Sequence, residues 1–279
     1  MISKKKIIII YQPWRKFSEG LHQPMIENLK KIGLKVEFLE VENPPKFQNK
    51  NWADKLKNIY HRIVKKDKTY IYVAEKNHYN RFNLEKLKLF KNQKFDFILI
   101  IKPDEFTPKF IKKASELGEI TAGYIWDGIR PFFLESLHKS RKYFKYLYSF
   151  DQNDIKKFPE LKMDFLTNYY VFDENRENYN TKELDLYYIG ALGGKLPEQR
   201  RDLLLEKLLK NFTGKTEVKI HLEKNFLLNE DEKLKNPKIE YIYDYVSYNE
   251  AMEKTKSSKI VIDIRKKHHI GLSFRFFEC

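Results

Sequence analysis

Short apolar runs alternate with amphipathic, helix-like segments from the beginning of this chain. The first run covers residues 6–11 and contains four consecutive isoleucines, and a second covers residues 35–41. Between them, apolar residues recur at helical spacing and stop at Gly33, a residue type that often follows the last turn of a helix. A strand, a helix and another strand in this order are typical of a parallel sheet with crossover helices. The sequence therefore predicts an α/β fold.

The alternation continues and then restarts, which predicts two Rossmann-like domains with parallel sheets. In the first domain, residues 1–172, further strands are expected at 95–101, 120–126, 143–150 and 162–171, and further helices at 52–64, 82–90, 107–117 and 151–159. Residues 70–73 are either a short strand or part of a lid. Residues 173–183 are polar and lack periodicity, so we interpret them as the linker between the domains.

The second domain covers residues 184–279. Its strand-like runs and helical patterns lie at 184–189, 218–222, 239–246 and 260–264, and at 198–212 and 247–256. Ser247 and Glu250 have the spacing of a capping box at the start of the last of these helices. The chain stops soon after the last strand, so we expect this domain to be truncated at its C-terminus. Whether this exact chain is active stays open.

Composition excludes several classes of protein. The single cysteine, Cys279, excludes an intrachain disulfide and a cysteine-rich metal site. No run approaches the roughly 18 apolar residues of a membrane span, and the N-terminal apolar run is too short for a signal peptide, so we expect a cytoplasmic protein. The formal charge of +15 comes from scattered lysines. It favours a solvated basic surface first, peripheral contact with an anionic inner membrane face or a phosphorylated glycolipid second, and nucleic acid last.

Polar residues follow one predicted strand of the first domain, where Trp126 is succeeded by Asp127 and Arg130. Open α/β sheets bind ligands beyond the carboxyl ends of their strands. Asp127 could there accept a proton from an acceptor hydroxyl or hold an acceptor sugar, with Trp126 as a stacking surface. In the alternative interpretation, Asp127 and Gly128 only form a turn and Trp126 belongs to the core. Asp151, after the next strand, is expected to cap a helix.

A glycine-rich turn, residues 190–194, follows the first strand of the second domain. Gly190 and Gly193 would let a phosphate approach the backbone, with Arg200 close behind, or they only make a tight turn. Because no Gly-Lys-[Ser/Thr] follows, this turn is not a Walker A loop.

The end of the chain, residues 268–279, has the features of an anion-binding helix start. Gly271 permits close approach of a ligand to the backbone, and Ser273 can cap a helix or donate a hydrogen bond. Arg275 and Glu278 are three residues apart and so share one helical face. The N–H groups at a helix N-terminus are unpaired and attract anions. This segment could therefore hold a diphosphate with the arginine and ribose hydroxyls with the carboxylate.

The same region resembles the donor-site motif of bacterial polysaccharide glycosyltransferases, in particular CgeB-like and lipopolysaccharide- or capsule-type proteins. That motif is roughly an aspartate, a short gap and Gly-Leu-[Ser/Thr]-x-Arg-x-x-Glu, and the residues that match it are Asp263, Gly271, Leu272, Ser273, Arg275 and Glu278. Residues 124–128, 148–154 and 166–170 also resemble this group. The resemblance extends over most of residues 120–279.

The resemblance implies a GT-B-like enzyme that moves a sugar from a nucleotide-sugar donor to a cell-surface glycan or lipid-linked acceptor, without a further cofactor. The donor side that it implies comprises Gly190, Gly193, Arg200, Lys267, Gly271, Leu272, Ser273, Arg275 and Glu278. Within this set, Arg275 and a lysine such as Lys267 would neutralise the leaving diphosphate, while Glu278 would hold the ribose. Asp127 would be the acceptor-side base.

A metal is not expected in this site, because adjacent side chains such as His268 and His269 diverge and the sequence has no Asp-x-Asp triplet. Two other classes of protein stay open. One is a non-catalytic or degenerate protein that binds glycans or anionic lipids on the same scaffold. The other is a nucleic-acid-binding module, which would depend steeply on salt.

Overall fold

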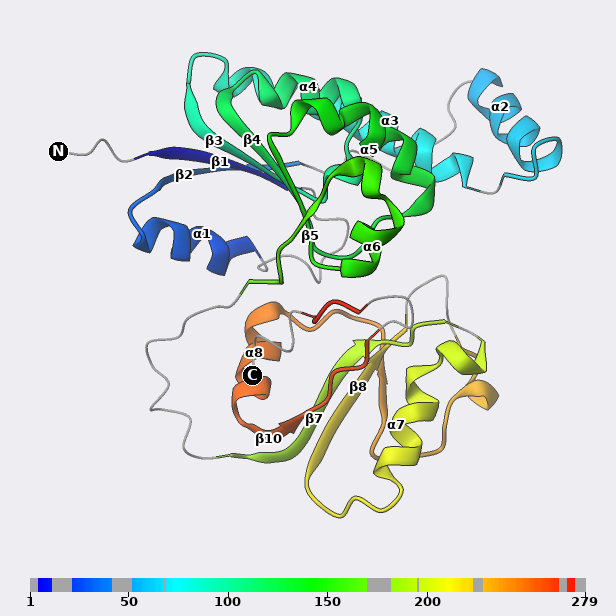
Figure 1. Ribbon diagram of the computed structural model, residues 1–279. Helices are drawn as coiled ribbons and strands as arrows, with labels where there is room; N and C mark the ends of the chain where they lie inside the picture. Colours follow the sequence, from blue (N-terminus) through cyan, green and yellow to red (C-terminus); the bar gives the residue numbers. More distant parts are fainter. Residues whose placement is uncertain are drawn as a thin grey trace. The chain divides into compact units, whose positions relative to one another are not determined.

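The structure, a computed structural model, describes residues 5–11, 22–41, 52–67, 69–169, 182–194, 196–222, 228–265 and 270–273. The chain divides into two compact units (Figure 1). The first unit comprises residues 1–14 and 26–168, and the second comprises residues 15–25 and 169–279. Most of the predicted linker, residues 173–181, lies outside the described residues, and the predicted domain limits stay a prediction.

The first unit contains a six-stranded sheet in the order β2-β1-β3-β4-β5-β6, and every pairing is parallel. Its strands are β1 Lys6–Tyr11, β2 Lys35–Glu40, β3 Phe95–Ile101, β4 Gly118–Ile125, β5 Tyr146–Ser149 and β6 Asp164–Phe165. Because β1 lies between β2 and β3, the order of strands reverses between β1 and β3. Open sheets of this kind bind ligands beyond the carboxyl ends of the strands at such a reversal.

The helices that lie in the first unit, wholly or in part, are α1 His22–Lys31, α2 Trp52–Ile63, α3 Tyr70–Leu87, α4 Pro108–Ser115, α5 Leu134–Ser140 and α6 Gln152–Lys157. Residues 22–25 of α1 are assigned to the second unit. The alternative of a strand at residues 70–73 is wrong, since these residues begin α3, which ends within the helix predicted at 82–90. The buried positions of α3 are Lys76, Tyr79, Asn80, Asn83 and Leu87, so polar residues interrupt the apolar pattern of its packed face. In place of the strand expected at 143–150 the structure has the shorter β5, and β6 is the strand among the described residues of the stretch expected at 162–171.

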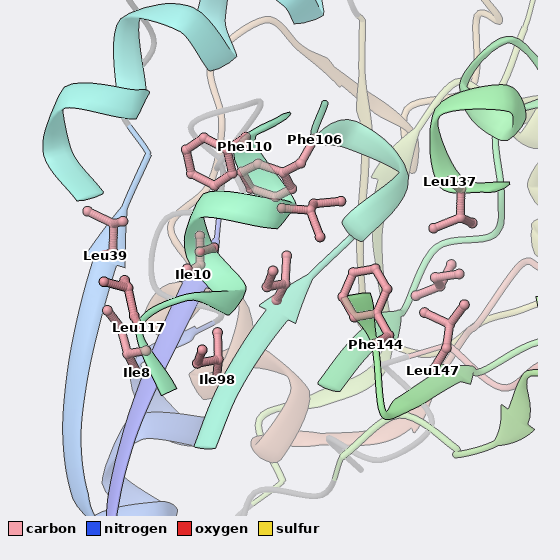
Figure 2. Close-up of a cluster of buried hydrophobic side chains, with 14 of the residues drawn as sticks. Ile8, Ile10, Leu39, Ile98, Phe106, Phe110, Leu117, Leu137, Phe144 and Leu147 are labelled. Atoms are coloured by element: carbon pink, nitrogen blue, oxygen red, sulfur yellow. The ribbon is translucent and has the colours of Figure 1, made fainter. Parts of the chain in front are cut away.

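The core of the first unit lies where β1, β3 and β4 meet α4 and α5. Ile7 to Ile10 of β1 are all buried, as expected for a central strand of a parallel sheet that is covered on both faces. Figure 2 shows Ile8 and Ile10 of β1 and Ile98 of β3 in one cluster with Phe110 of α4. Full burial of side chains of this size contributes about 1.5–3 kcal/mol each. This rigid sheet fixes the positions of the residues that follow its strands.

The second unit has a four-stranded parallel sheet in the order β10-β7-β8-β9. Its strands and helices are β7 Leu184–Ala191, β8 Thr216–His221, β9 Glu240–Ile242, β10 Ser258–Val261, α7 Arg201–Leu209 and α8 Tyr248–Lys256. Ser247 caps α8 by accepting a hydrogen bond from the Glu250 N–H. A separate core joins Leu186 and Ile220 of this sheet to Leu205 of α7. The predicted fold class, α/β with parallel sheets, is confirmed.

Short 3₁₀ turns connect several of these elements, at Lys88–Phe90, Pro103–Glu105, Pro131–Phe133, Arg141–Tyr143, Pro159–Leu161, Pro197–Gln199 and Glu230–Glu232. Among the described helices, none combines the length and apolarity that crossing a bilayer requires. The cytoplasmic location expected from the sequence stays a prediction.

Candidate functional site

The carboxyl end of β3 turns sharply through Lys102. This residue has φ 53° and ψ 59°, in the left-handed region, and leads into the 3₁₀ turn Pro103–Glu105. Its N–H still donates to the Tyr124 carbonyl of β4, at 2.8 Å. A non-glycine residue in this region is strained by about 1–2 kcal/mol, and such strain is found preferentially at functional sites. All three residues of this turn are buried, so it places two carboxylates, Asp104 and Glu105, in the interior.

A group of charged side chains, which we call the β3–β4 ion cluster, consists of Lys102, Asp104, Glu105, Asp127 and Arg130. Lys102 Nζ lies 3.5 Å from Glu105 Oε1 and 4.0 Å from Asp127 Oδ2. Arg130 Nη1 lies 3.5 Å from the same Glu105 oxygen. The Glu105 side chain is only 1% exposed, whereas that of Asp127 is 43% exposed. The cluster therefore links buried charges to one carboxylate that reaches solvent.

Several polar atoms of the β3–β4 ion cluster have no hydrogen-bond partner among the described residues. They are Lys102 Nζ, Glu105 Oε2 and both carboxylate oxygens of Asp104. Burying such groups without hydrogen bonds costs free energy, and most buried polar atoms in proteins do find a partner. The described residues thus leave the hydrogen-bonding capacity of these buried atoms unused.

Burial is the main influence on the charges in this cluster. It raises the pKa of Glu105 to about 7, although Lys102 acts in the opposite direction, and Asp104 adds to the rise. Burial alone would lower the pKa of Lys102, but the carboxylates of Asp104, Glu105 and Asp127 outweigh it, and that pKa is raised. Near neutral pH, Lys102 therefore keeps its positive charge while Glu105 is close to its titration midpoint.

Asp154 of α6 fixes the loop that carries Asp127 and Arg130. Its Oδ2 accepts a hydrogen bond from the Ile129 N–H at 2.9 Å. Burial raises the pKa of Asp154 to about 6, although the hydrogen bond from Ile129 opposes the rise. Neighbouring Asp151 caps α6 by accepting from the Asn153 N–H at 2.9 Å, which confirms its predicted role.

Trp126 is 7% exposed and packs edge-on against Tyr11, with 5.0 Å between ring centroids. Tyr11 ends β1 and Trp126 follows β4, so the two rings meet beside the carboxyl end of β3, which lies between these strands. This arrangement fits the interpretation of Trp126 as a core residue that supports the site.

The glycine-rich turn after β7 is held by its own backbone. Gly190 and Ala191 still belong to β7, and Gly193 has φ +98°. A Cβ on Gly193 would clash with the carbonyl oxygen of Gln199. The Arg201 N–H donates to the Leu192 carbonyl at 3.0 Å and closes the loop. Loop geometry alone explains a glycine at position 193, and a role for Gly190 or Gly193 on the donor side stays a prediction.

Arg200 takes part in a saturated network that we call the Asp202 network. Its Nε donates to Asp202 Oδ1 at 3.0 Å and its Nη2 donates to Oδ2 and to the Glu232 carbonyl. Tyr241 Oη also donates to Asp202 Oδ2, at 2.7 Å. Burial by itself would raise the pKa of Asp202, but the hydrogen bonds from Arg200 and Tyr241 outweigh it, and the pKa is lowered. The contacts in the structure tie Arg200 to the start of α7, and its donor-side role stays a prediction.

The C-terminal motif is described in part. Gly271 is buried, Leu272 is 40% exposed, and Ser273 Oγ is buried without a hydrogen-bond partner among the described residues. Arg265 Nη1 donates to the Ile270 carbonyl at 2.9 Å. Three of the predicted donor-side residues, Lys267, Arg275 and Glu278, lie outside the described residues.

The structure thus brings together Asp127 and Arg130, which the sequence singled out, with three residues that it did not: Lys102, Asp104 and Glu105. The available signal was the charged Lys-Pro-Asp-Glu run directly after a buried strand. Within the described ranges, no three His, Cys, Asp or Glu side chains are arranged to hold a metal ion.

Comparison with known proteins finds no matching family model and no matching curated sequence. Similar solved structures include an α-glucosyltransferase in complex with UDP and a 13-mer DNA containing an HMU base, with 11% identity, 98% of this chain and 76% of that chain covered, and a TM-score of 0.58. They also include the UDP-GlcNAc 2-epimerase of Methanocaldococcus jannaschii in complex with UDP-GlcNAc and UDP, with 15% identity, 92% and 78% coverage and a TM-score of 0.49. The likeness to the α-glucosyltransferase shows that the chain has a GT-B-like fold. The narrower resemblance to CgeB-like proteins stays a prediction.

Proposed function

We propose that this protein is a glycosyltransferase that moves a sugar from a nucleotide-sugar donor to a glycan or lipid-linked acceptor of the cell surface. The observation that carries the proposal is the GT-B-like fold, which the chain shares over 98% of its length with a glucosyltransferase solved with UDP. The β3–β4 ion cluster supports it, because its exposed carboxylate lies beyond the carboxyl end of β4, one strand away from the reversal between β1 and β3.

Asp127 is the acceptor-side base in this proposal. As the acceptor oxygen bonds to the anomeric carbon, the bond from that carbon to the diphosphate breaks and the acceptor proton passes to the Asp127 carboxylate. Lys102, whose Nζ is 4.0 Å away, fixes the carboxylate at the edge of the buried cluster. A positioned base of this kind accelerates a reaction by roughly 10²–10⁴-fold.

The donor side of the proposal rests on the sequence motif. Arg275, Lys267 and the expected helix start would neutralise the developing charge of the leaving diphosphate, and Glu278 would hold the ribose. Buried Gly271 and the Ser273 hydroxyl belong to the same segment. Preorganised positive charge at this position is what a diphosphate leaving group requires when no metal assists.

The test is a thermal-shift titration of the longest natural form of the chain with UDP, GDP, CMP and ADP, with single-stranded DNA as the control. We expect one nucleotide to raise Tm saturably in the wild type and in Asp127→Asn, but not in Arg275→Ala. Asp127→Asn should lower transfer by about 10²-fold or more while nucleotide binding is kept. If no nucleotide raises Tm, the transferase proposal fails in favour of a non-catalytic binding protein on this scaffold.

A further inference from the structure

Helix α2 exposes its apolar side. Trp52 is 80% exposed and Ile63 is 69% exposed, and Leu56 and Ile59 are also exposed. At 3.6 residues per turn these four side chains form one continuous stripe along the helix. Tyr60 borders the stripe and is exposed as well. An apolar stripe of this kind normally faces a protein core, and a large exposed one marks an interaction surface.

The opposite, polar side of α2 is the one that is partly buried. Asn58 and His61 are less exposed than the residues of the stripe. The His61 ring stacks on Tyr70 of α3, with 3.9 Å between centroids, and its Nδ1 lies 3.4 Å from Asp67 Oδ2. Asp67 Oδ1 accepts hydrogen bonds from the N–H and the hydroxyl of Thr69. These contacts fix the rotation of α2, so its outward apolar side is set by specific interactions.

Figure 1 shows α2, in light blue, beside the start of α3. Among the described elements, α3 is the main neighbour of α2. The polar contacts through His61 therefore anchor the helix to the first unit, while the stripe stays uncovered by the described residues of that unit.

Basic residues border the apolar stripe. On a helical projection Lys55 and Arg62 lie along one edge, Lys57 lies beyond Tyr60 on the other side, and Lys65 and Lys66 follow the helix. Lys55 Nζ lies 5.6 Å from the centre of the Trp52 ring. Long basic side chains of this type can rest on apolar surface and keep their charged ends at a polar boundary.

We propose that α2 docks the protein on an anionic lipid bilayer, with the apolar stripe inserted at the boundary between headgroups and acyl chains. Amphipathic helices with Trp and Leu on one face and Lys or Arg beside it bind membranes in this manner. Anionic headgroups attract juxtaposed lysines and arginines, so the stripe and its basic borders would act together.

A second copy of the chain matches the stripe less well than a bilayer does. Two-fold pairing would bring the same surface of both copies together. The basic residues beside the stripe, Lys55, Lys57 and Arg62, would then gather from both copies at one interface, where like charges repel. An anionic membrane supplies both an apolar layer and negative charge. This inference goes beyond sugar transfer, and binding to vesicles is measured without donor or acceptor, so either proposal can fail while the other stands.

The test is flotation of the full chain with phosphatidylcholine vesicles that contain or lack phosphatidylglycerol, at low and high salt. We expect binding to the anionic vesicles that falls with salt. Leu56→Gln/Ile63→Gln should weaken it by about tenfold or more, because two inserted side chains become polar. The matched control is Leu204→Gln/Leu208→Gln on α7, where both leucines are also exposed, and it should bind as the wild type does.

Two further readouts distinguish the occupants of the stripe. Anionic vesicles should shift the tryptophan emission to shorter wavelength in the wild type and not in Trp52→Phe, since Trp52 would enter the bilayer. Equal vesicle binding by Leu56→Gln/Ile63→Gln and the wild type would overturn the proposal. A second result would also overturn it. If the wild type binds no vesicles but its sedimenting mass rises with protein concentration, and Leu56→Gln/Ile63→Gln abolishes that rise, the stripe pairs with a second copy of the chain.

Discussion

Both sheets are followed by buried charges at the carboxyl ends of their strands, but the two sets of charges differ in how fully they are paired. In the Asp202 network of the second unit, the carboxylate accepts from two nitrogens of Arg200, from Tyr241 and from the Leu203 N–H. In the β3–β4 ion cluster of the first unit, both carboxylate oxygens of Asp104 find no hydrogen-bond partner among the described residues.

This difference indicates which edge is built for architecture and which for chemistry. A network in which every donor and acceptor is paired stabilises its surroundings and offers no unpaired donor or acceptor to a ligand. An incompletely satisfied cluster costs stability, and such exceptions are concentrated where a protein binds or reacts. In the proposed reaction the first sheet would carry the acceptor-side base, whereas the charges of the Asp202 network hold the loop between β7 and α7.

The largest effect on stability should come from Asp202→Ala. The substitution leaves the Arg200 guanidinium and the Tyr241 hydroxyl without their shared acceptor in a site where the Asp202 side chain is fully buried. Removing one partner of a buried ion pair costs about 3–5 kcal/mol. Urea unfolding should show this loss for the second unit.

Glu206→Ala is the matched control for that substitution, because Glu206 lies one turn further along α7 and is partly exposed. Its effect should stay within about 0.5 kcal/mol. A loss below 1 kcal/mol in Asp202→Ala would mean that the network is not structural and would break the contrast between the two edges.

The second effect is a pH dependence that should belong to the first unit. Burial raises the pKa of Glu105 from its usual 4.5 to about 7. Between these two values the folded protein keeps a proton that the unfolded chain releases, so stability should fall as pH rises through this window and level off above it. The contribution is on the order of 3 kcal/mol at most.

Glu105→Gln should roughly halve this slope below pH 6 and remove it between pH 6 and 7, as measured by urea unfolding at several pH values in the window. Below pH 6, Asp154, whose pKa is raised to about 6, would leave a slope of similar size and the same sign. Glu135→Gln serves as the control, since the Glu135 side chain is 81% exposed and the slope should persist. If Glu105→Gln leaves the dependence of unfolding free energy on pH unchanged, Glu105 does not hold a proton in the folded protein over this pH window.

Much of the fold could be predicted because its central strands are covered on both faces. Residues 7–10 of β1 and the apolar run of β3 form continuous hydrophobic stretches, which is the pattern of buried parallel strands. Only the second half of α3 was predicted, as part of the helix at 82–90, because its first half packs through Lys76 and Asn80, whose polarity gives no periodic signal. Local pattern predicts an element well only when its packed face is apolar.

The candidate site could be predicted only in part, because its members come from different strands. Asp127 could be found from its place after a strand, but its contact with Lys102 depends on the pairing of β3 with β4 and on a left-handed turn at Lys102. Sequence periodicity likewise shows that Trp52 and Ile63 share a face of α2. It cannot show that this face is left uncovered, which only the tertiary contacts of His61 reveal.

The smallest effect we expect is that of Gly193→Ala. It tests whether the turn after β7, in the second unit, has a chemical role besides its architectural one. Gly193 has φ +98°, and a Cβ there would clash with the Gln199 carbonyl oxygen. Gly33 has the similar φ of +95° with no atom within 4 Å of a built Cβ, so Gly33→Ala isolates the cost of backbone strain, about 1 kcal/mol. Gly193→Ala should cost about 2 kcal/mol or more in urea unfolding, because the clash adds to the strain.

Nucleotide affinity measured on the same two variants then separates the roles of the turn. If the turn is only architectural, Gly193→Ala should bind the nucleotide found by thermal shift with the affinity of Gly33→Ala once both are folded. If the backbone at Gly193 also approaches a phosphate, the added methyl group should weaken binding by about tenfold in Gly193→Ala alone, since it blocks close approach. That result would show that the second edge, in spite of its saturated charges, contributes its backbone to the donor side.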